Sequence, residues 1–172
     1  MKKYWLLLAL PVIALDRWVK WWASDTMRSK VLLSSGRHYS EPFIPGVDLT
    51  YATNTGASFS FLAGGGSVSR WFLVGVSALA VGFIILAVLK NRVRHPLTII
   101  ALAALLGGAA GNLIDRVYAG YVVDMFKFTF VEFAIFNVAD VFITVGGAAF
   151  VILYALLEAK KGEPDAGLDQ NG

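Results

Sequence analysis

Asp124 and Asp140 are the two residues whose type and surroundings best suit catalysis. Asp124 follows two valines, and Asp140 lies in an apolar segment that contains no basic residue. Two carboxylates that share a site cannot both ionise at low cost, so the pair holds one proton around a bound water. The ionised member can deprotonate that water, and the protonated member can donate to a substrate carbonyl or to a leaving amine. This is the chemistry of an aspartic protease, and the titration belongs to the pair.

Other kinds of catalytic site have little support. The chain has no cysteine, which excludes disulfides, a thiol nucleophile and cysteine–metal sites. The two histidines, His38 and His95, fall on opposite sides of the membrane in the topology predicted below. No serine has a histidine or lysine at a recognisable spacing, and His and Cys clusters that would suit zinc are missing. We therefore expect neither a metal nor a cofactor.

Further polar residues fall at the same ends of the apolar segments as the two aspartates. Spacings of four and three place Gly108, Asn112 and Asp115 on one stripe of a helix. Small residues let helices approach closely, so a second stripe facing this one would bring Asp140 near Asn112 and Arg116. The second stripe consists of Asn137, Asp140, Thr144 and Gly147. The polar residues at the same helix ends as the two aspartates are Asp16, Lys20, Asn112, Asp115, Arg116 and Asn137.

Each of these features also has a purely structural interpretation, which the sequence leaves open. The glycines could serve packing alone, and Asp124 could be a surface charge on a strand, near Lys127. The remaining structural interpretations are an i, i+4 ion pair for Asp16 and Lys20, a helix-end pair for Asp115 and Arg116, a helix–helix contact for Asn112, and an ordinary turn for Asn54 to Gly56.

The composition indicates the elements that must position these residues. Of the 172 residues, 57% are hydrophobic and 16% charged, against about 45–50% and about 25% in soluble domains. The excess of apolar residues favours a single small membrane domain over a soluble enzyme. The net charge of +3 comes without a basic stripe interleaved with aromatics, so we expect no nucleic-acid partner.

Four segments have roughly the 20 apolar residues that cross a bilayer as a helix. They are residues 4–22, 71–89, 97–118 and 136–157. The first is expected to stay in the protein, because no small-x-small cleavage site follows it. The sequence thus predicts a mainly α, polytopic membrane protein with four transmembrane helices in one domain, residues 1–160, and a disordered tail, residues 161–172.

Basic residues predict the orientation of these helices. Short loops rich in Lys and Arg stay in the cytoplasm, which places both termini and the loop around Lys90 there. Segments 23–70 and 119–135 are then extracytoplasmic. Their short β-prone pieces predict one small sheet at the membrane surface. The basic residues that set this orientation are Lys2, Lys3, Lys90, Arg92, Arg94, Lys160 and Lys161.

Four runs of residues together resemble signal peptidase II, the bacterial lipoprotein signal peptidase. They are residues 54–57 (NTGA), 107–116 (GGAAGNLIDR), 122–124 (VVD) and 136–140 (FNVAD), and the resemblance spans roughly residues 15–157. It implies a four-helix aspartyl protease of the bacterial inner membrane, with cytoplasmic termini, an extracytoplasmic β-sheet cradle and sensitivity to globomycin. It further implies cleavage of diacylglyceryl-prolipoproteins before the lipidated cysteine, in contact with membrane lipid, and a monomer suffices for the site.

The resemblance assigns the catalytic pair to Asp124 and Asp140. One motif departs from the family pattern, in which Asp-Gln-x-Ser/Thr-Lys is usual, because residues 16–20 read DRWVK here. This leaves the roles of Arg17 and Val19 open. The predicted substrate-binding or supporting residues are Asn54, Gly56, Gly108, Asn112, Arg116, Asn137, Asp16, Lys20 and Asp115.

Two other classes of function compete with a protease. A small proton-coupled transporter would also place carboxylates in the membrane, but the polar groups gather at one face and no helix is broken near its middle. A membrane scaffold has no use for two aspartates at matched depth. Exchanging either aspartate for asparagine would separate the three classes.

Overall fold

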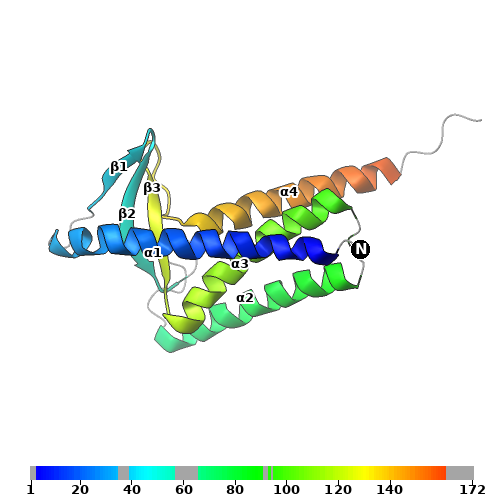
Figure 1. Cartoon of the computed structure of the whole chain (residues 1–172), viewed down its shortest axis with the longest axis horizontal. Coiled ribbons are helices and arrows are strands. Elements are labelled where there is room, and N and C mark those ends of the chain that lie inside the picture. The colour runs from blue at the N-terminus through cyan, green and yellow to red at the C-terminus, as the bar shows by residue number, and fades with distance from the viewer. Residues whose placement is uncertain (1–2, 35–38, 57–65, 91–92, 94, 162–172) are drawn as a thin grey trace, which may run out of the picture.

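Long helices run side by side, and a small sheet covers one end of them (Figure 1). The computed structural model describes residues 3–34, 39–56, 66–90, 93 and 95–161. We call the covered end the sheet end; the N-terminus, the last turn of α2 and the first turn of α3 lie at the opposite end (Figure 1). The elements are η1 (Lys3–Leu8, a 3-10 helix), α1 (Ala9–Leu33), β1 (Glu41–Ile44), β2 (Val47–Asn54), α2 (Gly66–Leu89), α3 (Pro96–Tyr118), β3 (Val122–Phe128) and α4 (Val138–Lys161).

Three of the described helices are long and apolar enough to cross a membrane, namely α2, α3 and α4. Only α3 has much of its span buried by the rest of the protein, whereas α2 and α4 leave large apolar side chains such as Leu79 and Val151 exposed. Such continuous apolar surface is typical of helices that face lipid. The helix α1 differs because it carries several charged residues, among them Asp16, Arg17 and Lys20.

The helix α1 continues well beyond its predicted end. We predicted a helix over residues 4–22 followed by an extracytoplasmic segment, but α1 runs to Leu33. The extension is stabilised by Ala23 and Met27, which lie one turn apart and are fully buried against the sheet. The polar residues between them, Ser24, Asp25 and Thr26, hide this short apolar stripe in the sequence. The other helices differ from the predicted bounds by a few residues at their ends, and residues 162–172 of the predicted tail lie outside the described residues.

The three strands form one antiparallel sheet in the order β1-β2-β3, which confirms the predicted small sheet. A tight turn at Gly46, whose φ of 87° suits glycine, connects β1 to β2. In the pairing of β2 with β3, Ala52 lies opposite Asp124. Asn54 lies two residues further along β2 and therefore on the same face of the sheet as Asp124.

Glycines on α3 let the other helices approach closely. A Cβ at Gly107 would lie 2.6 Å from Val12 of α1, and a Cβ at Gly108 would lie 2.4 Å from the carbonyl oxygen of Ala139 on α4. The predicted stripe on α4 is wrong towards its middle, because Gly146 rather than Gly147 packs against α3. The contact face of α4 follows a spacing of four and three through Ala139, Ile143 and Gly146.

Candidate active site

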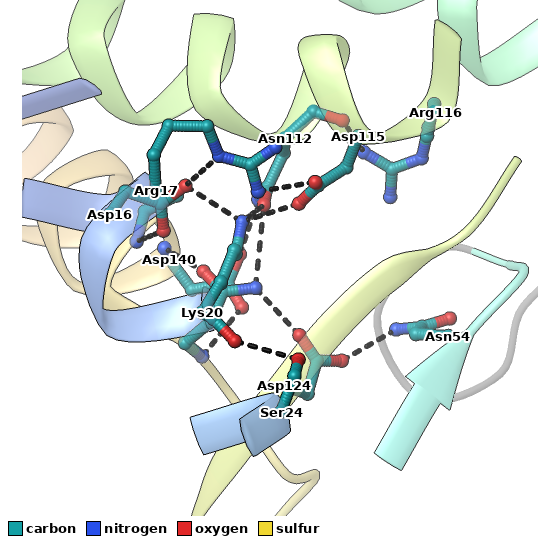
Figure 2. A network of polar contacts seen from close by, with 12 residues as sticks. Asp16, Arg17, Lys20, Ser24, Asn54, Asn112, Asp115, Arg116, Asp124 and Asp140 are labelled. Carbon is teal, nitrogen blue, oxygen red and sulfur yellow. Dashed lines mark hydrogen bonds and ion pairs between the residues drawn. The ribbon is translucent and has the colours of Figure 1, made fainter. Parts of the chain in front are cut away.

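Polar side chains from α1, α3, α4 and the sheet meet at the sheet end of the helices (Figure 2). Both predicted catalytic aspartates belong to this cluster. Asp124 comes from β3 and Asp140 from the first turn of α4. The sheet therefore brings one carboxylate to the helix end that carries the other.

Asp140 is held by the cap of its own helix. The backbone N–H of Asp140 donates to Asn137 Oδ1 at 2.9 Å, and the backbone N–H of Asn137 donates to Asp140 Oδ2 at 3.2 Å. This reciprocal pair is a capping box, which satisfies two N–H groups that the helix start would otherwise leave free. The cap fixes the Asp140 carboxylate relative to the Asn137 amide.

Asp124 is positioned by its strand. Its neighbours Val123 and Met125 pack in the cluster formed with α1, so that Asp124 points to the opposite face. Backbone hydrogen bonds between Phe126 and Phe136 fold the chain back on itself after β3. This fold-back places the start of α4, and with it Asn137, beside Asp124.

Two amide side chains connect the aspartates. Asn137 Nδ2 donates to Asp124 Oδ1 at 2.6 Å and to Asn112 Oδ1 at 3.3 Å. Asn112 Nδ2 in turn donates to Asp140 Oδ1 at 2.8 Å. Asn54 Nδ2 donates to the second oxygen of Asp124 at 3.1 Å. Each carboxylate therefore accepts N–H bonds while remaining close to the other.

The electrostatics of the site make it easier for Asp124 to hold a proton. Burial raises the pKa of Asp124 to about 6, and the charge of Asp140 acts in the same direction. The N–H bonds from Asn137 and Asn54 oppose this rise. A carboxyl group with such a pKa can hold or release a proton near neutral pH, as an aspartic protease requires.

An ion cluster borders the aspartate pair on the side of α1. Lys20 Nζ lies 2.8 Å from Asp16 Oδ2 and 2.7 Å from Asp115 Oδ2, and Arg17 forms an ion pair with Asp115. Asp16 also accepts the backbone N–H of Ala139 at 2.9 Å. The predicted ion pair between Asp16 and Lys20 is thus present, as one part of a larger cluster. The pairing of Asp115 with Arg116, which the sequence left open, is wrong, because Asp115 faces α1.

Arg116 reaches main-chain oxygens at the edge of the site. Its Nη2 donates to the carbonyl of Gly56 at 3.2 Å and its Nη1 to that of Asn112 at 3.4 Å. The negative charges of Asp140 and Asp124 favour the charged form of the Arg116 guanidinium. The backbone N–H of Gly56 also donates to Asn54 Oδ1 at 2.9 Å. Arg116 thereby ties the turn after β2 to α3.

The structure brings most of the predicted site residues into contact. Gly108 contributes a close approach of α3 to α4, and every other predicted residue takes part in the polar contacts above. Within the described ranges, no three His, Cys, Asp or Glu side chains are arranged to hold a metal ion.

Arg70 was not predicted from the sequence. Its Nε donates to the carbonyl of Arg116 at 2.8 Å and its Nη2 to that of Val117 at 2.6 Å. It thereby caps the end of α3, just before the chain enters β3. In the sequence, the feature that could have indicated this role is a lone arginine at the start of an apolar helix.

This arrangement defines a class of protein: a mainly helical membrane protein with two hydrogen-bonded aspartates at one end of its helices, beneath a small sheet. Comparison with known proteins identifies the family. The family described as Signal peptidase (SPase) II matches residues 8–157. The chain belongs to the signal peptidase II family, a family of peptidases.

Relatives from several bacteria agree with this assignment. The Lipoprotein signal peptidase of Serratia proteamaculans is 37% identical over 165 residues, which cover 95% of this chain and 93% of the relative. The enzyme of that name from Escherichia coli is 45% identical over 124 residues, covering 69% of this chain and 73% of the relative.

Solved structures show the same fold. A bacterial membrane enzyme determined by the in meso method at 2.3 Å resolution superposes with a TM-score of 0.73 at 25% identity, covering 96% of this chain and 94% of that one. A second, determined by the same method at 1.9 Å, gives a TM-score of 0.71 at 29% identity, covering 90% and 92%.

Proposed function

We propose that this protein is an aspartic endopeptidase that removes the signal peptide from prolipoproteins, cutting before the diacylglyceryl-modified cysteine. The observation that carries the proposal is the linkage of Asp124 and Asp140 through Asn112 and Asn137, with the pKa of Asp124 raised to about 6. Family membership and relatives named Lipoprotein signal peptidase support the substrate class.

The pair acts on a water molecule bound between the two carboxyl groups. The ionised carboxylate takes a proton from the water as its oxygen attacks the scissile carbonyl carbon, and the protonated carboxyl donates to the carbonyl oxygen. When the tetrahedral intermediate collapses, the C–N bond breaks and the amine leaves with a proton from the pair. The cationic Arg116 beside the pair stabilises the negative charge that develops on the carbonyl oxygen.

Lipid supplies most of the substrate recognition. The scissile peptide must be extended, because helical carbonyls are already hydrogen-bonded, and it lies at the sheet end beneath β2 and β3. The two acyl chains stay in the bilayer along the apolar faces of the helices, where α2 and α4 leave side chains such as Leu79 and Val151 exposed. Each buried CH₂ contributes roughly 0.8 kcal/mol, which anchors the cysteine next to the pair.

The protein crosses the bacterial inner membrane as one domain of four helices, with α1 as the fourth span despite its charges. The ion cluster within α1 pairs those charges inside the protein, which lowers the cost of placing them at the membrane. Both termini are cytoplasmic, which the basic residues near them favour. The sheet end, opposite the N-terminus in Figure 1, is then extracytoplasmic. All the residues used here come from one chain, so a monomer suffices.

A direct test compares lipidated and unlipidated forms of one precursor. The purified protein in detergent should cleave the diacylglyceryl precursor, and mass spectrometry should place the new N-terminus at the lipidated cysteine. The unlipidated precursor of identical sequence should be cleaved very poorly, and globomycin should block the reaction. Equal rates on both precursors would show that lipid is not the recognition element, and no cleavage of either would contradict the proposed activity.

A further inference from the structure

The ammonium group of Lys20 makes three polar contacts inside the protein, two ion pairs and one hydrogen bond. It contacts Asp16 Oδ2 at 2.8 Å, Asp115 Oδ2 at 2.7 Å and Asn112 Oδ1 at 2.9 Å. The side chains of Lys20 and Asp16 are at least 97% buried. Lys20 therefore forms a fixed, water-excluded contact with the amide that bonds to Asp140.

This contact determines which way the Asn112 amide points. An ammonium group only donates hydrogen bonds, so it can face only the oxygen of an amide. Asn137 Nδ2, also a donor, approaches the same oxygen. If the amide were turned over, its nitrogen would face these two donors, and its oxygen would face a carboxylate oxygen of Asp140. The amide nitrogen is thus directed at Asp140.

Arg17 determines whether Lys20 is free for this contact. Asp16 and Asp115 carry two negative charges in a nearly dry place, and Lys20 alone balances only one of them. The ion pair between Arg17 and Asp115 supplies the second positive charge, and buried charges are costly unless they are paired. With the cluster neutral, Lys20 can keep its hydrogen bond to Asn112.

We propose that Lys20 is a positioning residue for the aspartate pair: it fixes the direction of the Asn112 amide, and Arg17 supports it by neutralising Asp115. The inference rests on the proposed function of the pair. It gives a role to Arg17, which stands where the family motif usually has glutamine. It also means that α1 helps to position the aspartate pair, in addition to supporting the sheet.

A double-mutant cycle on kcat tests the inference. Lys20→Met keeps the length of the side chain but removes its donors, and should lower kcat about 10- to 100-fold with little change in KM, the range for a hydrogen bond to a charged group. If Lys20 acts through Asn112, then Lys20→Met added to Asn112→Ala should cause no further loss of kcat when each variant is measured at its own pH optimum. A double mutant whose loss is the product of the two single losses would overturn the inference.

Arg17→Gln provides a second cycle in case Lys20→Met does not fold. It should lower kcat severalfold in the wild-type background and not at all in the Asn112→Ala background. Equal losses in both backgrounds would overturn the role of Arg17. The matched control is Lys30→Met, also on α1, whose ion pair with Glu41 is exposed and far along the helix. It should leave kcat unchanged.

The pH profile of kcat gives a readout that a loss of stability alone would not move. Burial and Asp140 raise the pKa of Asp124, while Lys20 lowers it together with the amides of Asn137 and Asn54. Arg116, on α3, is a further charged group that interacts electrostatically with Asp124. Lys20→Met should therefore shift the profile to higher pH, and an unshifted profile would contradict the inference.

Two further variants separate this inference from the proposed function. Asp124→Asn and Asp140→Asn should abolish turnover of the diacylglyceryl precursor. If either retains activity, the proposed mechanism fails whatever the cycles show. If both are inactive and the cycles are additive, the mechanism stands and the positioning role of Lys20 is wrong.

Discussion

Adding one methyl group at Gly108 should separate the aspartate pair without touching it. The Cβ of Gly108→Ala would lie 2.4 Å from the Ala139 carbonyl oxygen and 2.9 Å from Ile143 Cγ1. The nearer contact is to main chain, which cannot rotate away. Ordinary contact begins at 3.4 Å, so α3 and α4 must move apart by about 1 Å at this level.

The displacement occurs one turn from the hydrogen bond between Asn112 and Asp140. That bond is 2.8 Å long, and lengthening it by about 1 Å would break it. A misplacement of about 1 Å costs on the order of 100-fold in rate. Overpacking costs about 1–3 kcal/mol of stability, of which the better helix propensity of alanine returns up to about 1 kcal/mol. Activity should therefore fall much more than stability.

The assay measures kcat on the diacylglyceryl precursor together with the thermal unfolding temperature. Gly147→Ala is the matched control, because it lies on α4 and a Cβ there would meet nothing within 4 Å. It should keep full activity and be as stable as the wild type or more so. If Gly108→Ala retained kcat within twofold of the wild type, the close approach of α3 and α4 would not set the geometry of the pair.

Three further predictions concern the surroundings of the pair. The pKa of Asp124 is about 6 in the folded protein and 3.8 ordinarily, so between these pH values the folded state binds a proton that the unfolded state does not. The free energy of unfolding should therefore fall as pH rises from about 4 to 6. Asp124→Asn should remove this part of the pH dependence, as measured in denaturant titrations. Arg70→Gln should lower the free energy of unfolding by about 1.5–3 kcal/mol, because it removes the hydrogen bonds that cap α3. Arg70→Lys should lose less of this free energy. Arg28→Gln, at an exposed site, is the control and should change stability little. Asn54→Ala should lower kcat about 10-fold through loss of its bond to Asp124, and an unchanged kcat would exclude this contribution.

Local spacing predicted the centre of the site but not its outer contacts. The spacing of Gly108 and Asn112, and the depth shared with Asp140, correctly placed the Asn112 amide near that carboxylate. The ion pair between Arg17 and Asp115 joins residues 98 positions apart, and no periodicity within either helix indicates such a partner. The same holds for Arg70, whose partners become available only where α3 ends.

The wrong predictions about the fold have similar causes. The extension of α1 past Trp22 depends on burial of Ala23 and Met27 by a sheet that other segments form. Its own sequence there is mostly polar and is typical of a loop. On α4, the choice between Gly146 and Gly147 as the contact residue depends on how the helix is rotated about its axis. The capping box at Asn137 sets that rotation, together with the fold-back between Phe126 and Phe136.

The central claim is that Asp124 and Asp140 together carry the hydrolysis, and single substitution of each tests it most directly. Asp124→Asn and Asp140→Asn should each fold, as judged by thermal unfolding in detergent, and should each fail to release the signal peptide from a diacylglyceryl precursor that the wild type cleaves to completion. Cleavage by either variant at more than about one hundredth of the wild-type rate would show that the pair is not the catalytic group.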